Sequence, residues 1–199
     1  KTLVPISCMK ILIVQNKNAA SAFAVKPSHV EKIKEISPDA EVIIDDGVGD
    51  HTDSDIIIGG ELKDFDGLKN LKWFHFTGAG VDFLQDAELK SDVVITNSSG
   101  VHPIPIAEHV FTFMLMFERK FTKAFRDQME KKWEKNYERF NVSELHGKTI
   151  GIIGMGNIGS KIAQLAKAFD MKVLAVVRTL RKNEDYADEL HDYTGLDKV

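Results

Sequence analysis

A short glycine-rich turn between two apolar segments of strand length constrains the fold of this chain more than any other feature. The segment Lys148–Ile153 has the length and composition of a buried strand, and it leads directly into the pattern GxGxxG at Gly154–Gly159. A helix-like segment, Ser160–Phe169, follows, and a second strand-like segment spans Lys172–Val177. A strand, a glycine turn, a helix and a strand within about 30 residues predict a βαβ unit with a parallel sheet.

The three glycines of the pattern have separate physical roles in such a turn. Gly154 permits the tight turn, Gly156 lets the backbone approach a pyrophosphate without a Cβ in the way, and Gly159 lets the helix pack closely on the strand. The N-terminus of the helix supplies free N–H groups and a partial positive charge to the phosphates. The pattern therefore predicts a dinucleotide site made of six consecutive residues: Gly154, Met155, Gly156, Asn157, Ile158 and Gly159. The alternative is a glycine-rich turn with a purely structural role.

The end of the second strand bears on which dinucleotide binds. NAD enzymes carry Asp or Glu there to hold the ribose hydroxyls, whereas this chain has Val177 followed by Arg178 and Thr179. Two further cations, Arg181 and Lys182, come next. Cations and a hydroxyl attract a 2′-phosphate, and a charge-assisted hydrogen bond of this kind contributes roughly 1.5–3 kcal/mol. We therefore expect NADP as the favoured cofactor and NAD as the alternative; a basic surface loop beside a cofactor bound in another way is also open.

Apolar segments of strand length recur through the first half of the chain. They lie at Met9–Val14, Glu41–Ile44, Ile56–Ile58, Leu71–Phe76 and Val93–Thr96, with a helical pattern over Lys26–Ile36. Strands that alternate with helices or loops predict an α/β layer with a parallel sheet here as well.

The stretch from Pro103 to about Trp133 interrupts this alternation. It is apolar on nearly all sides from Ile104 to Phe117 and charged from Glu118 onward. We predict one long helix, opened by prolines that fit a first turn, whose buried half and exposed half join two domains. The alternative is a core helix with a solvated, charged tail.

Composition points to no nucleic acid and no membrane as a partner. The formal net charge is −4, and no apolar run approaches the roughly 20 residues that span a bilayer. The single cysteine, Cys8, cannot form an intrachain disulfide, so we expect a cytoplasmic protein. The segment from Met9 resembles a natural start, and residues 1–8 are expected to be either an added expression tag or an unstructured leader.

Two further blocks precede the glycine turn in a fixed order. One runs from Phe76 to Asp82 (FTGAGVD), and the other runs from Thr96 to His109 (TNSSGVHPIPIAEH). With LHGKT before the glycine turn, these blocks resemble the D-isomer-specific 2-hydroxyacid dehydrogenase family over about residues 9–199. The resemblance implies that backbone N–H groups at Ala79 and Gly80 bind the substrate carboxylate, as glycines beside a short residue would allow.

The resemblance also implies roles for residues around the start of the long helix. Ile106 aligns with a position that packs near the nicotinamide, and Glu108 and His109 align with a structural pair. The separation of His102 and His109 is not that of a zinc site, so we expect no metal.

What the family does sets the remaining expectations. The fold is expected to be α/β, with a flavodoxin-like substrate domain at residues 9–103 and a truncated Rossmann domain at 104–199. The reaction would be hydride transfer between NAD(P)H and a 2-oxo acid, with a homodimer as the functional form. The family's catalytic Arg, Glu and His are expected beyond Val199, so residues 1–199 alone are expected to be inactive. A non-catalytic, dinucleotide-sensing regulator is the alternative, and the identity of the 2-oxo acid stays open.

Overall fold

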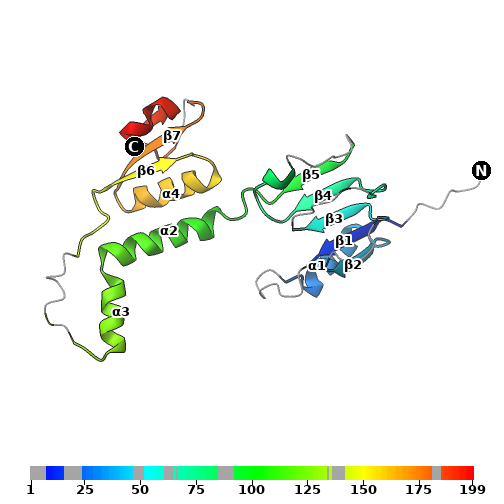
Figure 1. The fold of residues 1–199 in the computed structure, drawn as a ribbon, viewed down its shortest axis with the longest axis horizontal. Helices are drawn as coiled ribbons and strands as arrows, with labels where there is room; N and C mark the ends of the chain where they lie inside the picture. Colours follow the sequence, from blue (N-terminus) through cyan, green and yellow to red (C-terminus); the bar gives the residue numbers. More distant parts are fainter. Residues whose placement is uncertain are drawn as a thin grey trace, which may run out of the picture. The chain divides into compact units, whose positions relative to one another are not determined.

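The chain folds into two compact units, Lys1–Ser99 and Gly100–Val199. A computed structural model describes residues 8–15, 24–46, 52–60, 65, 67–84, 92–133, 135, 142–180 and 185–199. Each unit contains a parallel β-sheet with its own buried core (Figure 1). The units are described separately below.

The first unit is built around a five-stranded parallel sheet. Its elements are β1 (Lys10–Val14), α1 (Pro27–Ile36), β2 (Glu41–Asp45), β3 (Ile56–Gly59), β4 (Trp73–Phe76) and β5 (Val94–Asn97). The strand order is β2-β1-β3-β4-β5, and every pairing is parallel. This is the 2-1-3-4-5 order of flavodoxin-like folds, so the flavodoxin-like prediction is confirmed.

Alternation along β1 explains why both faces of this sheet are buried. Ile11 and Ile13 pack in a cluster that includes Ile33 of α1, whereas Leu12 belongs to a second cluster, with Phe74 of β4. Successive side chains of a strand point to opposite faces, so a continuous apolar run can fill two cores at once. This is why the strands of the first unit appear in the sequence as short apolar runs.

The second unit is a three-stranded parallel sheet with helices against it. Its elements are α2 (Pro103–Glu118), α3 (Phe121–Met129), β6 (Thr149–Ile153), α4 (Asn157–Ala168), β7 (Lys172–Val177) and β8 (Glu189–Asp192), followed by the 3-10 turn η4 (Tyr193–Lys198). The strand order is β6-β7-β8, equivalent to one half of a doubly wound dinucleotide-binding sheet. The predicted βαβ unit is therefore confirmed, with helix α4 between β6 and β7.

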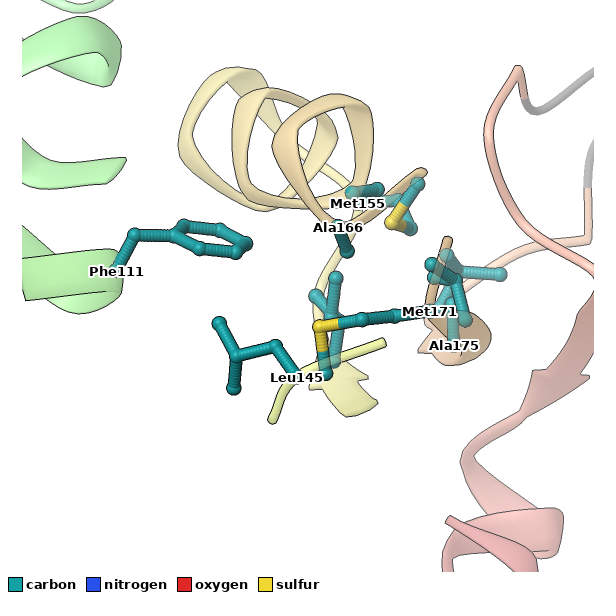
Figure 2. Close-up of a cluster of buried hydrophobic side chains, with 10 residues drawn as sticks. Phe111, Leu145, Met155, Ala166, Met171 and Ala175 are labelled. Carbon is teal, nitrogen blue, oxygen red and sulfur yellow. The ribbon is translucent and has the colours of Figure 1, made fainter. Parts of the chain in front are cut away.

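The core of the second unit lies between α2, α4 and the sheet (Figure 2). Phe111 of α2 stacks on Phe169 just after α4, with ring centroids 5.2 Å apart. Ala163 and Ala166 of α4 are fully buried, and their small side chains let α2 and the sheet approach α4 closely. Packing on α4 thus explains one side of the apolar first half of the predicted long helix, where Ala107 and Phe111 are buried. Phe113 and Phe117 on α2 are exposed, so the prediction that this half is buried holds for that side only.

The prediction of one continuous helix from Pro103 to about Trp133 is wrong. Helix α2 ends at Glu118, Lys120 has a left-handed backbone (φ 52°), and α3 begins at Phe121. The backbone N–H of Ser143 donates to the Glu118 carbonyl at 2.9 Å, and Lys148 Nζ forms a 2.6 Å ion pair with the Glu118 carboxylate. The carbonyl and the carboxylate of the last residue of α2 are therefore bound by residues that come after α3. These contacts allow the chain to turn there.

A third strand of the second sheet, β8, is also present, where no strand was predicted after Val177. Strand β8 pairs with β7, and Asp188 just before it fixes their register. The Asp188 carboxylate accepts hydrogen bonds from Lys167 Nζ at 2.8 Å and from the Val173 N–H at 2.7 Å. These two donors, Lys167 first, lower the pKa of Asp188, so the carboxylate is ionised at neutral pH.

No helix within the described part of the chain is long and apolar enough to cross a bilayer.

Candidate functional site

The glycine turn leaves β6 at a backbone conformation that favours glycine. Gly154 follows the last residue of β6 with φ +95°, in the left-handed region that other residues rarely adopt. Its N–H donates to the Val176 carbonyl at 2.8 Å, which ties the turn to β7. The turn is therefore held at the carboxyl ends of both strands, where ligands of open α/β sheets bind.

Gly156 stands directly before α4 and faces open space. A Cβ at this position would have no atom within 4 Å, because the backbone is extended there (φ −80°, ψ −166°) and the residue is exposed. As a glycine N-cap it has no side chain to accept from the first N–H groups of α4, and the first turn of α4 contains no acidic residue. A phosphate can approach these N–H groups without steric or charge repulsion.

Gly159 is the point of closest approach between α4 and the turn. A Cβ there would lie 1.9 Å from the Gly154 carbonyl oxygen and 3.2 Å from Ile152 Cγ2. No side chain can be accommodated at that distance, so glycine is required for the helix to approach the strand. Gly154, Gly156 and Gly159 thus have the three geometries that their positions in the pattern predict.

The other residues of the turn divide between the core and solvent. Met155 is buried in the core of the second unit, and its carbonyl accepts from Ser160 Oγ at 3.2 Å, whereas Asn157 and Ile158 are exposed. Gly100, at the start of this unit, lies beside Asn157: a Cβ at Gly100 would be 3.3 Å from Asn157 Nδ2. No local sequence pattern predicts this contact, since 57 positions separate the two residues.

Ile106 lies in the first turn of α2 and is 37% exposed. Its neighbour Ala107 is fully buried, so α2 presents Ile106 outward while it packs through the adjacent face. His109 contacts Phe113 along the same helix, with ring centroids 4.7 Å apart, and Glu108 is exposed.

Strand β7 ends in the core at Val177, and the first residues after it are exposed. Val177 is only 9% exposed and packs in the core of the second unit, whereas Arg178 and Thr179 are exposed. Asp192 of β8 lies beside Val177 in register, and its carboxylate accepts from the Thr194 hydroxyl at 2.5 Å and from the Thr194 N–H at 2.9 Å. These bonds lower the pKa of Asp192. Arg181 and Lys182 lie outside the described residues.

In the first unit, the loop after β4 lies at the carboxyl edge of the five-stranded sheet. Thr77 anchors it, since its N–H and its hydroxyl donate to the Gly59 carbonyl at 2.8 and 3.0 Å. Ala79 and Gly80 follow and are exposed. Within the described ranges, no acceptor receives the backbone N–H of Ala79 or Gly80. These N–H groups can therefore bind an anion.

A cavity of about 500 Å³ lies at the opposite, amino edge of the same sheet. Its lining includes Asp55, whose carboxylate accepts from the Lys10 N–H at 2.9 Å and from Lys72 Nζ at 2.7 Å. Burial raises the pKa of Asp55, but the bonds from Lys10 and Lys72 outweigh it and the net change is downward. Because this carboxylate is already paired and the predicted residues lie at the other edge, we do not assign the site to this cavity.

Comparison with known proteins agrees with these geometries. Residues 111–199 match the family model described as D-isomer specific 2-hydroxyacid dehydrogenase, NAD binding domain. The chain is 41% identical over 108 residues to D-3-phosphoglycerate dehydrogenase of Archaeoglobus fulgidus, which covers 54% of this chain and 20% of that protein. It is 34% identical over 154 residues to hydroxypyruvate reductase of Thermotoga maritima, which covers 76% of this chain and 47% of that protein.

A solved structure extends the similarity to nearly the whole chain. A D-isomer specific 2-hydroxyacid dehydrogenase family protein from Aeromonas salmonicida superposes with a TM-score of 0.77 at 26% identity, over 96% of this chain and 60% of that one. The resemblance to the D-isomer-specific 2-hydroxyacid dehydrogenases is therefore confirmed, and the second unit is a Rossmann-like NAD-binding domain. The chain spans less than half the length of the two curated relatives named above.

Two glycine substitutions should separate the binding role of the turn from its structural role. Gly156→Val places a side chain in open space, so we expect the melting temperature to stay close to that of the wild type while dinucleotide binding is lost. Gly159→Ala places a methyl group against the Gly154 carbonyl, so we expect a clear loss of thermal stability. Thermal unfolding and calorimetric titration with NADH and NADPH, on the whole protein, measure both effects. Unchanged dinucleotide affinity in Gly156→Val would show that the turn is only structural.

Proposed function

We propose that this chain is the N-terminal part of a 2-hydroxyacid dehydrogenase, which transfers a hydride between NAD(P)H and a 2-oxo acid. The observation that carries the proposal is the turn between β6 and α4, which combines open space at Gly156 with the tight contact at Gly159. The family model over the same residues and the relatives named above support it.

The residues of each unit take distinct parts in this proposal. Residues Gly154 to Gly159 cradle the pyrophosphate with backbone N–H groups, and Ile106 packs near the nicotinamide. The exposed N–H groups of Ala79 and Gly80 bind the substrate carboxylate by charge-assisted hydrogen bonds. The bound nicotinamide supplies or accepts the hydride, and the protein orients the reactants around it. We propose that the Arg, Glu and His that complete the site lie beyond Val199, and that the 199 residues alone are inactive.

Activity on 2-oxo acids should distinguish this proposal from the regulatory alternative. We expect the whole protein to oxidise NADPH or NADH in the presence of a 2-oxo acid such as hydroxypyruvate, measured by the loss of absorbance at the wavelength of the reduced nicotinamide. A dinucleotide-sensing regulator would bind the same cofactor without turnover on any 2-oxo acid. Tight cofactor binding together with no reduction across a panel of 2-oxo acids would therefore favour the regulator.

We further propose NADP as the favoured cofactor. The position where NAD enzymes carry an acidic residue is Val177, which is committed to the core, and the first exposed side chains after it are Arg178 and Thr179. The one acid beside this position in the described register, Asp192, already accepts two bonds from Thr194. A guanidinium next to a hydroxyl matches a 2′-phosphate better than it matches two ribose hydroxyls.

Removal of the Arg178 guanidinium should therefore weaken NADPH selectively. We expect Arg178→Ala to lower kcat/KM for NADPH by roughly tenfold or more, through loss of a charge-assisted bond, and to change kcat/KM for NADH much less. Lys34→Ala, which removes an exposed cation of α1 in the first unit, is the control and should change neither value. Val177→Asp is a poorer test, because it would put a carboxylate into the core. An equal loss for both cofactors in Arg178→Ala, or a wild type that prefers NADH, would contradict the assignment.

For the whole protein we propose a homodimer formed through α2 and α3. Helix α3 has nine residues and, among the described elements, packs mainly against the end of α2 (Figure 1). An isolated helix of this length is marginal in water, so it needs a partner along its apolar face. That face is formed by Phe121, Phe125 and Met129, which are each more than half exposed.

The exposed aromatic area is close to what a dimer requires. Five aromatic side chains of this region are between 46% and 87% exposed: Phe113, Phe117, Phe121, Phe125 and Trp133. At about 200 Å² for a whole aromatic side chain they expose about 600 Å², and a standard interface buries about 800 Å² on each partner. Monomers rarely expose so large an apolar surface, and a second copy brings the same surface to a two-fold contact.

A charge in the middle of this surface should prevent dimer formation. We expect the wild-type protein to sediment as a dimer at micromolar concentration and Phe125→Glu to sediment as a monomer, because two buried carboxylates would face each other across the two-fold axis. Ile36→Glu, which changes an apolar residue of α1 that is more exposed than Phe125, should leave the dimer intact. A wild-type monomer, or a dimeric Phe125→Glu, would refute the α2–α3 interface.

A further inference from the structure

Besides the anchor at Thr77, the loop after β4 is held through carbonyl groups, whose donors are the last residue of β5 and the residue that follows it. The Ser98 N–H donates to the Phe76 carbonyl at 3.1 Å and to the Gly78 carbonyl at 2.9 Å. The Asn97 side chain donates through Nδ2 to the Ala79 carbonyl at 2.7 Å. These three contacts, made by two donors, fix one side of the loop to the neighbouring strand.

Asn97 is itself fixed in the orientation that this contact requires. It is the last residue of β5, in register with Phe76 of β4. The Ser99 N–H donates to Asn97 Oδ1 at 3.2 Å, so the amide oxygen is engaged and the amide nitrogen is directed at the loop. Among the hydrogen bonds of Ala79 and Gly80 in the described chain, this is the one made by a side chain, so it can be removed without altering the strand backbone.

The hydrogen bonds to the Gly78 and Ala79 carbonyls determine the direction of the N–H groups in the same peptides. A trans peptide is planar, and its C=O and N–H point in opposite directions. The Gly78 carbonyl shares its peptide with the Ala79 N–H, and the Ala79 carbonyl shares its peptide with the Gly80 N–H. Once both carbonyls are directed at β5, the N–H groups of Ala79 and Gly80 must both point away from it, toward the same side.

We propose that Asn97 is a positioning residue for the substrate carboxylate. By holding the Ala79 carbonyl, it keeps the Gly80 N–H aligned with the Ala79 N–H, so that one carboxylate can accept from both. Without this bond the peptide between Ala79 and Gly80 can rotate, and the second donor is lost for part of the time. The inference rests on the proposed function, because it concerns the N–H groups that bind the 2-oxo acid there.

Steady-state kinetics of Asn97→Ala and Asn97→Asp in the whole protein test this role. Both variants lose the donor to the Ala79 carbonyl, whereas Asp keeps an acceptor for the Ser99 N–H. We expect KM for the 2-oxo acid to rise roughly fivefold to tenfold in both, the effect of one hydrogen bond. We expect KM for the nicotinamide cofactor to stay at the wild-type value, because the glycine turn belongs to the second unit. Inhibition by oxalate, which presents a similar carboxylate, should weaken by the same factor.

Thr96→Val is the matched control on the same strand. Thr96 Oγ1 interacts with Trp73 Nε1 and His75 Nδ1, each at 2.8 Å, so this variant also loses side-chain hydrogen bonds but none to the loop. It should leave KM for the 2-oxo acid unchanged. If Asn97→Asp behaves like the wild type, or if Thr96→Val raises this KM as much as Asn97→Ala does, the positioning role is refuted. An active wild type with unchanged KM in both Asn97 variants would refute this inference alone, whereas a wild type that reduces no 2-oxo acid would overturn the proposed function as well.

Discussion

The second unit depends on the contact between Gly159 and the carbonyl oxygen of Gly154. A Cβ would lie 1.9 Å from that oxygen, so α4 can approach β6 this closely only because the residue is glycine. The close approach places the N-terminus of α4 directly over the end of the strand and leaves open space at Gly156. It also brings the buried alanines of α4 against the sheet and α2. The proposed dinucleotide site and the core of the unit therefore depend on the same contact.

Both units place their candidate residues at the carboxyl ends of parallel strands. In the first unit these ends carry the loop at Ala79 and Gly80 with Asn97 beside it, and in the second they carry the glycine turn and Arg178. The amino edge of the first sheet has a cavity, but there the carboxylate of Asp55 is already paired with the Lys72 ammonium and the Lys10 N–H. Free backbone donors, rather than the presence of a cavity, distinguish the two edges.

The protein controls charge at these edges chiefly through its backbone. The N–H groups of Ala79 and Gly80 and those at the start of α4 can bind anions without any buried charged side chain, so the free protein does not bear the cost of desolvating a charge. Arg178 is different, because it is a full charge at an exposed position, and its contribution is screened by salt. If Arg178 selects the cofactor as proposed, that selectivity would be more sensitive to salt than binding of the pyrophosphate.

The glycine turn and most of the strands could be predicted from the sequence because they depend on local properties. A left-handed φ at Gly154 and a run of apolar residues such as those of β1 are each determined within a few positions of the chain. The break between α2 and α3, by contrast, depends on Ser143 and Lys148, which reach back to Glu118 across 25 and 30 positions. The hydrogen bond from Asn97 to the Ala79 carbonyl likewise joins residues that lie 18 positions apart. The sequence by itself determined where the glycine turn and most of the strands lie. Only the tertiary structure decided which distant groups form hydrogen bonds with one another, because those partners meet only when the strands are side by side.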